Sequence, residues 1–113
     1  MYVLVDLETT PAGVSLQEPQ DCGRFRMAVR GVDSVALGRV LAATATGWLL
    51  STGGGEEELG EAYVWIDAVR RMSVGRVGES WDSDLSGMVS YARSKGWLSQ
   101  DEKAIRAHIE LSR

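Results

Sequence analysis

Two acidic residues near the start of the chain, Asp6 and Glu8, have the types and the spacing that metal-dependent chemistry needs. Residues 2–8 combine branched apolar residues with an alternation of apolar and acidic ones, which predicts a β-strand with one face outside the core. Side chains two positions apart on a strand project from the same face, so both carboxylates could bind Mg²⁺ or Mn²⁺ through hard oxygen ligands. Two such ions can carry out phosphoryl-transfer chemistry, which needs further carboxylates to fix both of them.

The sequence Asp6-Leu7-Glu8-Thr9 resembles the first motif of DEDD-type 3′–5′ exonucleases, a strand that bears Asp-x-Glu-Thr. The resemblance implies that Asp6 and Glu8 are metal ligands of a metal-dependent phosphodiester hydrolase. That family also places a histidine or tyrosine a few residues before its last aspartate, whereas no aspartate follows His108. A strand whose solvent face carries two acids explains the segment more simply, and the hydrolase is kept as an alternative.

A second group of chemistry-bearing residues is basic. The segment 24–30 alternates arginines with Phe25, Met27 and Val29, which predicts a half-buried strand with one basic face. If a neighbouring strand adds its own bases, one sheet face would carry Arg24, Arg26, Arg30, Arg106 and His108. Clustered guanidinium groups bind phosphate or carboxylate with paired donors, so we expect a candidate anion site here. A solvated strand face with acidic partners such as Glu110 is the simpler interpretation.

Other catalytic sets are incomplete. The one cysteine, Cys22, lies close to Arg24 and could be a somewhat activated thiol, but no base is paired with it by spacing. One cysteine and one histidine do not supply the four ligands of a structural zinc site. Gly53–Gly55 lacks the Lys-Ser/Thr of a phosphate loop and runs into three glutamates. We therefore expect no cofactor and favour a protein that is not an enzyme.

Length and composition predict one domain over residues 1–113. The chain is 44% hydrophobic and 25% charged, which is ordinary for a globular protein. A lone cysteine favours a reducing compartment, and the absence of a long apolar run disfavours a membrane segment, so we expect a cytoplasmic protein. A net charge of −4 disfavours nucleic acid as the partner.

Periodicity predicts the elements that must position these residues. Strands are expected over 2–8, 24–30, 48–51, 62–66 and 103–111, and helices over 34–43, 68–72 and 82–95. Asp33 and Asp67 are the expected N-caps of the first two helices, and Gly96 is the expected stop of the third. Residues 9–23 are expected to form a loop and 52–60 an acidic hairpin tip. The alternation in 104–111 favours a strand, although the composition tolerates a helix.

These elements predict an α+β fold, a mixed, mostly antiparallel sheet of about five strands with two or three helices on one face. The four tryptophans are expected mostly in the core, with Trp81 and Trp97 the more exposed pair. An exposed edge strand could also support a homodimer.

The C-terminal half, from Trp81 to Glu110, resembles small uncharacterised proteins of high-GC actinobacteria, a resemblance that implies no activity. From the residues we favour a binding or interaction module whose partner is a protein or a small anionic ligand. An immunity or regulatory protein is a further alternative, because a small acidic domain can neutralise a basic partner surface.

Overall fold

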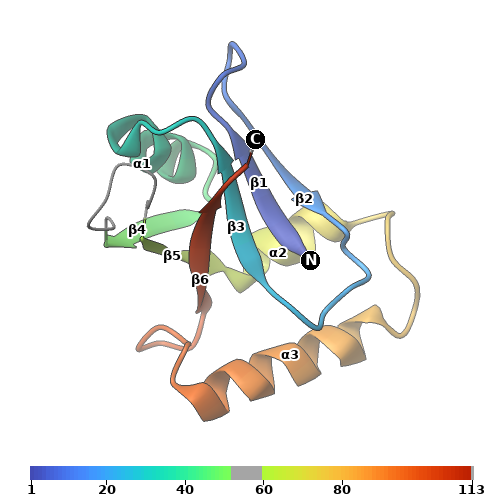
Figure 1. Cartoon of the computed structure of the whole chain (residues 1–113). Coiled ribbons are helices and arrows are strands. Elements are labelled where there is room, and N and C mark those ends of the chain that lie inside the picture. Colours follow the sequence, from blue (N-terminus) through green and yellow to red (C-terminus); the bar gives the residue numbers. More distant parts are fainter. Residues whose placement is uncertain (52–59, 113) are drawn as a thin grey trace.

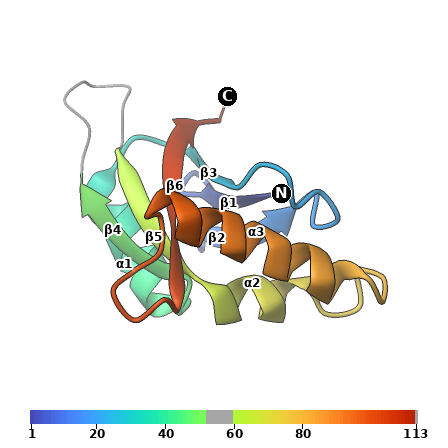
Figure 2. The same ribbon diagram turned by 90° about the horizontal axis from the view of Figure 1, so that it is seen from below.

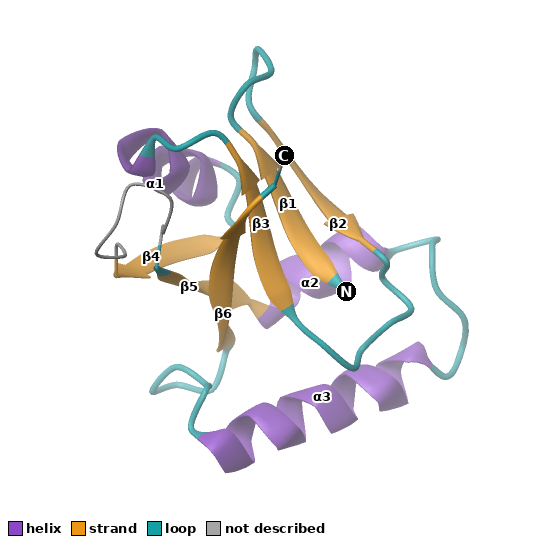
Figure 3. Ribbon diagram, in the orientation of Figure 1, coloured by secondary structure: helices purple, strands orange, loops and turns teal. Residues whose placement is uncertain are grey.

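The structure is a computed structural model, and it describes residues 1–51 and 60–112. Within these residues the chain forms six strands and three helices (Figures 1 and 3). The strands are β1 (Tyr2–Asp6), β2 (Gly13–Gln17), β3 (Arg26–Arg30), β4 (Gly47–Ser51), β5 (Glu61–Trp65) and β6 (Ala104–Leu111). The helices are α1 (Ser34–Ala43), α2 (Ile66–Ser73) and α3 (Trp81–Lys95). The predicted α+β class is confirmed.

The strands form one mixed sheet in the order β2-β1-β3-β6-β5-β4. The pairs β1–β2, β4–β5 and β5–β6 are antiparallel, whereas β1–β3 and β3–β6 are parallel. Strand β2 was not expected, because the prolines and glycines of residues 9–23 were interpreted as one loop. These residues instead bound a short strand in which Val14 and Leu16 pair with β1. Residues 52–59 of the predicted acidic tip lie outside the described residues.

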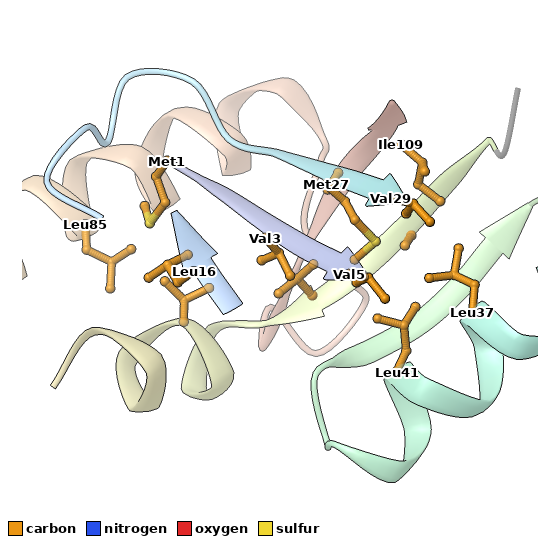
Figure 4. Packing of buried hydrophobic residues seen from close by; sticks show 14 of the residues in the cluster. Met1, Val3, Val5, Leu16, Met27, Val29, Leu37, Leu41, Leu85 and Ile109 are labelled. Carbon is orange, nitrogen blue, oxygen red and sulfur yellow. The ribbon is translucent and has the colours of Figure 1, made fainter. Parts of the chain in front are cut away.

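The core lies on one face of this sheet. Fully buried side chains from the strands include Val3, Val5, Leu16, Met27 and Val29, and the helices add Leu37, Leu41, Val69 and Leu85 (Figure 4). Figure 2 shows α1 and α2 on the same side of the sheet, with α3 across the end where β1 and β3 begin. None of these helices covers the opposite sheet face, which is called the open face below.

Local signals explain most helix boundaries. The Asp33 carboxylate accepts a hydrogen bond of 3.0 Å from the backbone N–H of Ala36, so the predicted N-cap of α1 is confirmed. The N-cap prediction for Asp67 is wrong, because α2 begins at Ile66 and places Asp67 within its first turn. Helix α3 ends where Gly96 adopts a left-handed backbone with φ of 74°.

The tryptophans are distributed differently from the prediction. Trp81 is 5% exposed, and its indole N–H donates to the carbonyl of Pro19 at 2.5 Å. Trp48 and Trp65 are half-buried on the open face, with ring centroids 4.7 Å apart. The reason is strand alternation, because Ala62 and Val64 of β5 face the core and Trp65 must face the other way.

Strand β2 is an edge of the sheet, and one of its peptide groups has a side-chain partner. Arg76, which follows α2, donates from Nη1 to the carbonyl oxygen of Leu16 at 2.7 Å. The same guanidinium nitrogen lies 3.4 Å from the carbonyl oxygen of Met72 at the end of α2. Arg76 therefore connects this edge strand to the helix beneath it.

Candidate ligand-binding pocket

The predicted strand 24–30 begins only at Arg26 in the structure, so Arg24 and Phe25 lie just before β3. The three arginines of this segment each lie beside a carboxylate. Nε of Arg26 is 3.3 Å from Glu110, and Nη2 of Arg24 is 4.0 Å from the same side chain. Nη1 of Arg30 is 3.7 Å from Asp6, its register partner on β1. Acidic partners therefore balance much of the charge that the sequence suggested for an anion site.

Asp6 and Glu8 do not share a strand face, because β1 ends before Glu8. Strand β1 ends at Asp6, so Glu8 is exposed in the turn that follows instead of on the same strand face. The backbone N–H of Glu8 donates to the Asp6 carboxylate at 3.0 Å. Among residues 1–51 and 60–112, no group of three His, Cys, Asp or Glu side chains is placed to hold a metal ion. The metal site stays a prediction that this geometry does not strengthen.

Strands β3 and β6 are hydrogen-bonded over only part of their lengths. Their register runs from Met27 opposite Ile109 to Val29 opposite Leu111, whereas residues 104–108 of β6 pair with β5 on the other side. Beside the first residues of β6, the place of β3 is taken by the segment after α3. The N–H of Arg106 donates to the carbonyl of Trp97 at 2.7 Å. The two strands therefore diverge toward α3 (Figure 1).

A pocket of ≈ 290 Å³ lies where these strands diverge. Its walls come from the segment just before β3, from the C-terminal half of α3 and the residue Trp97 that follows it, and from the start of β6. The lining residues are Gly23, Arg24, Phe25, Met88, Tyr91, Ala92, Trp97, Ile105 and Arg106. The rings of Tyr91 and Trp97 meet edge to face, with centroids 5.7 Å apart and planes at 74°. The wall is thus mainly apolar and aromatic, with two guanidinium groups among its members. We call it the β3–β6 pocket.

A smaller hollow of ≈ 210 Å³ adjoins the β3–β6 pocket. It shares Phe25, Trp97 and Arg106 and adds Glu61 and His108, which face each other across β5 and β6. Nε of Arg106 lies 3.2 Å from the Glu61 carboxylate, and the Arg106 side chain is 34% exposed. Arg106 therefore belongs to both hollows and is held in place by an acid from β5.

The β3–β6 pocket is the better candidate site, although two larger hollows lie elsewhere, and both are more open to solvent. One, of ≈ 340 Å³, lies between Trp48 and residues 99–101. The other, which we call the turn hollow, has ≈ 440 Å³ and is formed by the turn of residues 18–21 with Arg76. Ligand sites are concave and mostly apolar with a few convergent polar groups, which describes the β3–β6 pocket. The turn hollow lacks an aromatic wall.

The structure brings together part of the predicted anion site. Arg24 and Arg106 line the β3–β6 pocket, and His108 lines the adjoining hollow. Arg26 and Arg30 lie further along β3 with their carboxylate partners and are not wall residues. The aromatic wall was not predicted, because alternation assigned Phe25 to the core and gave no contact between Tyr91 and Trp97. A tryptophan directly after a helix-ending glycine was the only signal for it.

The surroundings of Cys22 raise the pKa of its thiol, whereas an activated thiol has a lowered pKa. Its side chain is half-buried. Burial raises the pKa of the Cys22 thiol most, the negative charge of Asp84 raises it further, the N-terminal amino group lowers it, and Asp21 adds a smaller increase. The net shift is upward, so the suggestion of a thiol activated by nearby Arg24 is wrong.

Comparison of the chain with protein-family models, curated proteins and solved structures gives no significant match. The helices of the described residues include none that is both long and apolar enough to span a membrane.

Proposed function

We propose that this chain is a binding domain that holds a small anionic ligand in the β3–β6 pocket. The observation that carries the proposal is the position of Arg24 and Arg106 in a wall that is otherwise mainly apolar and aromatic. Arg24 is the more available of the two, since its side chain is 78% exposed and its acidic partner among the described residues, Glu110, is 4.0 Å away. Arg106 is 34% exposed, and a guanidinium beside an apolar surface binds an anion more strongly than one in open water, because the local dielectric is lower.

Binding, rather than catalysis, fits the groups in this wall. Nucleophilic or acid–base chemistry needs a reactive group within hydrogen-bond reach of its partner. The acid of the adjoining hollow, Glu61, is paired with Arg106, and His108 is exposed at its rim. The proposal therefore assigns the pocket to recognition and leaves the phosphodiester hydrolase of Asp6 and Glu8 as the less supported alternative.

A fragment screen by NMR on ¹⁵N-labelled protein tests the proposal. We expect anionic fragments to be enriched among the binders and to shift the indole signal of Trp97 and the amide of Arg106. The Trp48 indole, on the open face, serves as the internal control. The proposal is wrong if the fragments that bind are mainly cationic, or if their shifts map away from the β3–β6 pocket.

A protein partner is the second candidate function, and the open face favours it. The ring of Trp48 lies 5.0 Å from that of Tyr63 and 4.7 Å from that of Trp65, and the three form a half-buried aromatic group on the sheet face that no described helix covers. Large aromatic residues are the side chains that most often dominate protein interfaces. An immunity or regulatory role would use this surface, and the net charge of −4 suits a basic partner.

Affinity capture with wild-type protein and with the Trp48→Ala variant tests this second candidate. A partner retained by the wild type and lost with Trp48→Ala would support it, whereas equal retention would contradict a role for the aromatic group.

We also propose a cytoplasmic location, on the basis of the single cysteine. The resemblance to small actinobacterial proteins stays a prediction.

A further inference from the structure

Resting on the proposed function, we infer that the ligand of the β3–β6 pocket is a monocarboxylate carried on a flat aromatic body. Three properties of the wall define this class: the arrangement of its rings, its volume and its net charge. Each excludes a different group of small anions.

The rings favour a flat body. Tyr91 and Trp97 stand at 74° to each other, so a planar ligand can stack on one ring and present its edge to the other. Phe25, which lies just before β3, and the thioether of Met88 from α3 complete the apolar wall. A puckered aliphatic ring would fill similar space, but it would lack these face and edge contacts. Tyr91 is 57% exposed, which places the stacking surface at the pocket entrance.

The volume limits the size of that body. Ligand pockets commonly measure about 300–1,000 Å³, and the β3–β6 pocket has ≈ 290 Å³. A body of one or two fused rings suits this space, whereas a nucleotide or a sugar phosphate is too polar for an apolar wall. The adjoining hollow adds ≈ 210 Å³, and the two residues that it does not share with the pocket, Glu61 and His108, do not extend the aromatic surface.

The charge favours a single negative charge on the ligand. Arg24 and Arg106 bring two positive charges to the wall, and Glu61, at 3.2 Å from Arg106, brings one negative charge. Glu110 is closer to Arg26, at 3.3 Å, than to Arg24, at 4.0 Å, so it neutralises Arg24 less. Among the described residues, the wall itself therefore keeps one positive charge for the ligand, and the Lys95 ammonium lies outside the wall, 5.6 Å from the centroid of the Tyr91 ring. A dianionic phosphate would be repelled by Glu61, whereas a carboxylate matches the planar guanidinium fork with one charge.

Calorimetric titration with four matched probes tests the inference. The probes are 2-naphthoate, its neutral amide 2-naphthamide, its dianionic analogue 2-naphthyl phosphate, and the non-planar cyclohexanecarboxylate. We expect 2-naphthoate to bind at least about tenfold more tightly than each of the others, a difference in line with one charge-assisted hydrogen bond or one stacked ring. Removing the charge or the flat ring therefore has a measurable effect.

Two variants test whether 2-naphthoate binds to the wall of the β3–β6 pocket. Arg24→Gln and Tyr91→Leu change exposed side chains and should leave folding intact, and each should weaken 2-naphthoate at least about fivefold. Arg93→Gln is the matched control, because Arg93 lies on α3 outside the pocket wall and pairs with Glu102 at 3.0 Å. The control variant should bind as the wild type does. A thermal melt of each variant verifies that it is folded.

The outcomes separate this inference from the proposed function. Equal or tighter binding of 2-naphthyl phosphate overturns the charge argument, and equal binding of cyclohexanecarboxylate overturns the flat body. If all four probes fail while other anionic fragments shift Trp97, the inference is wrong and the anion pocket stands. If no anionic molecule shifts the wall residues, the proposed function itself fails. Unchanged affinity in Arg24→Gln and Tyr91→Leu places any binding outside this pocket.

Discussion

The carbonyl oxygen of Tyr63 occupies the space that a Cβ atom at residue 47 would need. Gly47 is the first residue of β4, and it lies opposite Val64 on β5 immediately after the buried Thr46. The clashing atom belongs to backbone, which cannot rotate away as a flexible side chain would. We predict that Gly47→Ala lowers the free energy of unfolding by at least about 2 kcal/mol, measured by urea denaturation. A loss below about 0.5 kcal/mol, the level of an ordinary surface change, would contradict this packing.

Gly87 provides the opposite case on α3. It is exposed, and an added Cβ would meet no atom within 4 Å. Alanine restricts the unfolded chain and favours the helix, so Gly87→Ala should raise the free energy of unfolding by about 0.5–1 kcal/mol. The same denaturation experiment checks both glycine variants, and a destabilised Gly87→Ala protein would show that the helix surface has an unrecognised contact.

The N-cap of α1 allows a graded test. Because the Asp33 carboxylate accepts the Ala36 N–H, Asp33→Ala should cost about 0.5–2 kcal/mol of stability. Asp33→Asn keeps an acceptor oxygen and should stay close to the wild type. Equal losses in the two variants would mean that charge, rather than the capping hydrogen bond, stabilises this helix end.

Trp81 connects α3 to the turn after β2 through its bond to Pro19. Phenylalanine fills part of the same site but cannot donate, so Trp81→Phe should lower stability by about 1–3 kcal/mol. Trp65→Phe is the control, since Trp65 is half-buried on the open face and has no indole hydrogen bond within the described residues. Thermal unfolding of both variants gives the comparison, and a larger loss for Trp65→Phe would contradict the structural role of Trp81.

The raised pKa of the Cys22 thiol predicts slow alkylation at neutral pH. A thiol with a raised pKa carries less reactive thiolate at a given pH, so the pH–rate profile should be displaced to higher pH than that of a free cysteine. Asp84→Asn removes one of the charges that raise this pKa and should move the profile back toward lower pH. Asp82→Asn, which changes a neighbouring acid of the same helix, should leave it nearly in place.

Much of this fold follows from local pattern. Periodicity located α1, α3 and the alternating strand β6, because each has an uninterrupted apolar face. Strand β2 was missed because its five residues lie between prolines and glycines, where propensity favours a loop and only pairing with β1 stabilises the strand. The N-cap role of Asp67 failed for a related reason, since tertiary contacts start α2 directly at the end of β5.

The candidate site was only partly predictable. Alternation placed Arg24 and Arg106 outside the core, which is a local property of each strand. It could not show that β6 changes partners along its length, so that β3 pairs with it only from Ile109 onward. The β3–β6 pocket exists because of this change, and the meeting of Tyr91 with Trp97 depends on how α3 crosses the sheet. Such features come from topology and not from the residues of any one segment.

The bond from Arg76 to Leu16 also affects how the molecule behaves at high concentration. The exposed edge strand of a sheet has unpaired peptide groups that can pair with a strand from another copy and so begin aggregation. At β2 the carbonyl of Leu16 is already taken, and a second chain approaching this edge would have to displace a charged side chain. Two copies that paired through their β2 edges would also bring their two Arg76 side chains together, and these like charges repel each other. We therefore expect Arg76, which connects β2 to α2, to disfavour self-association through this edge strand.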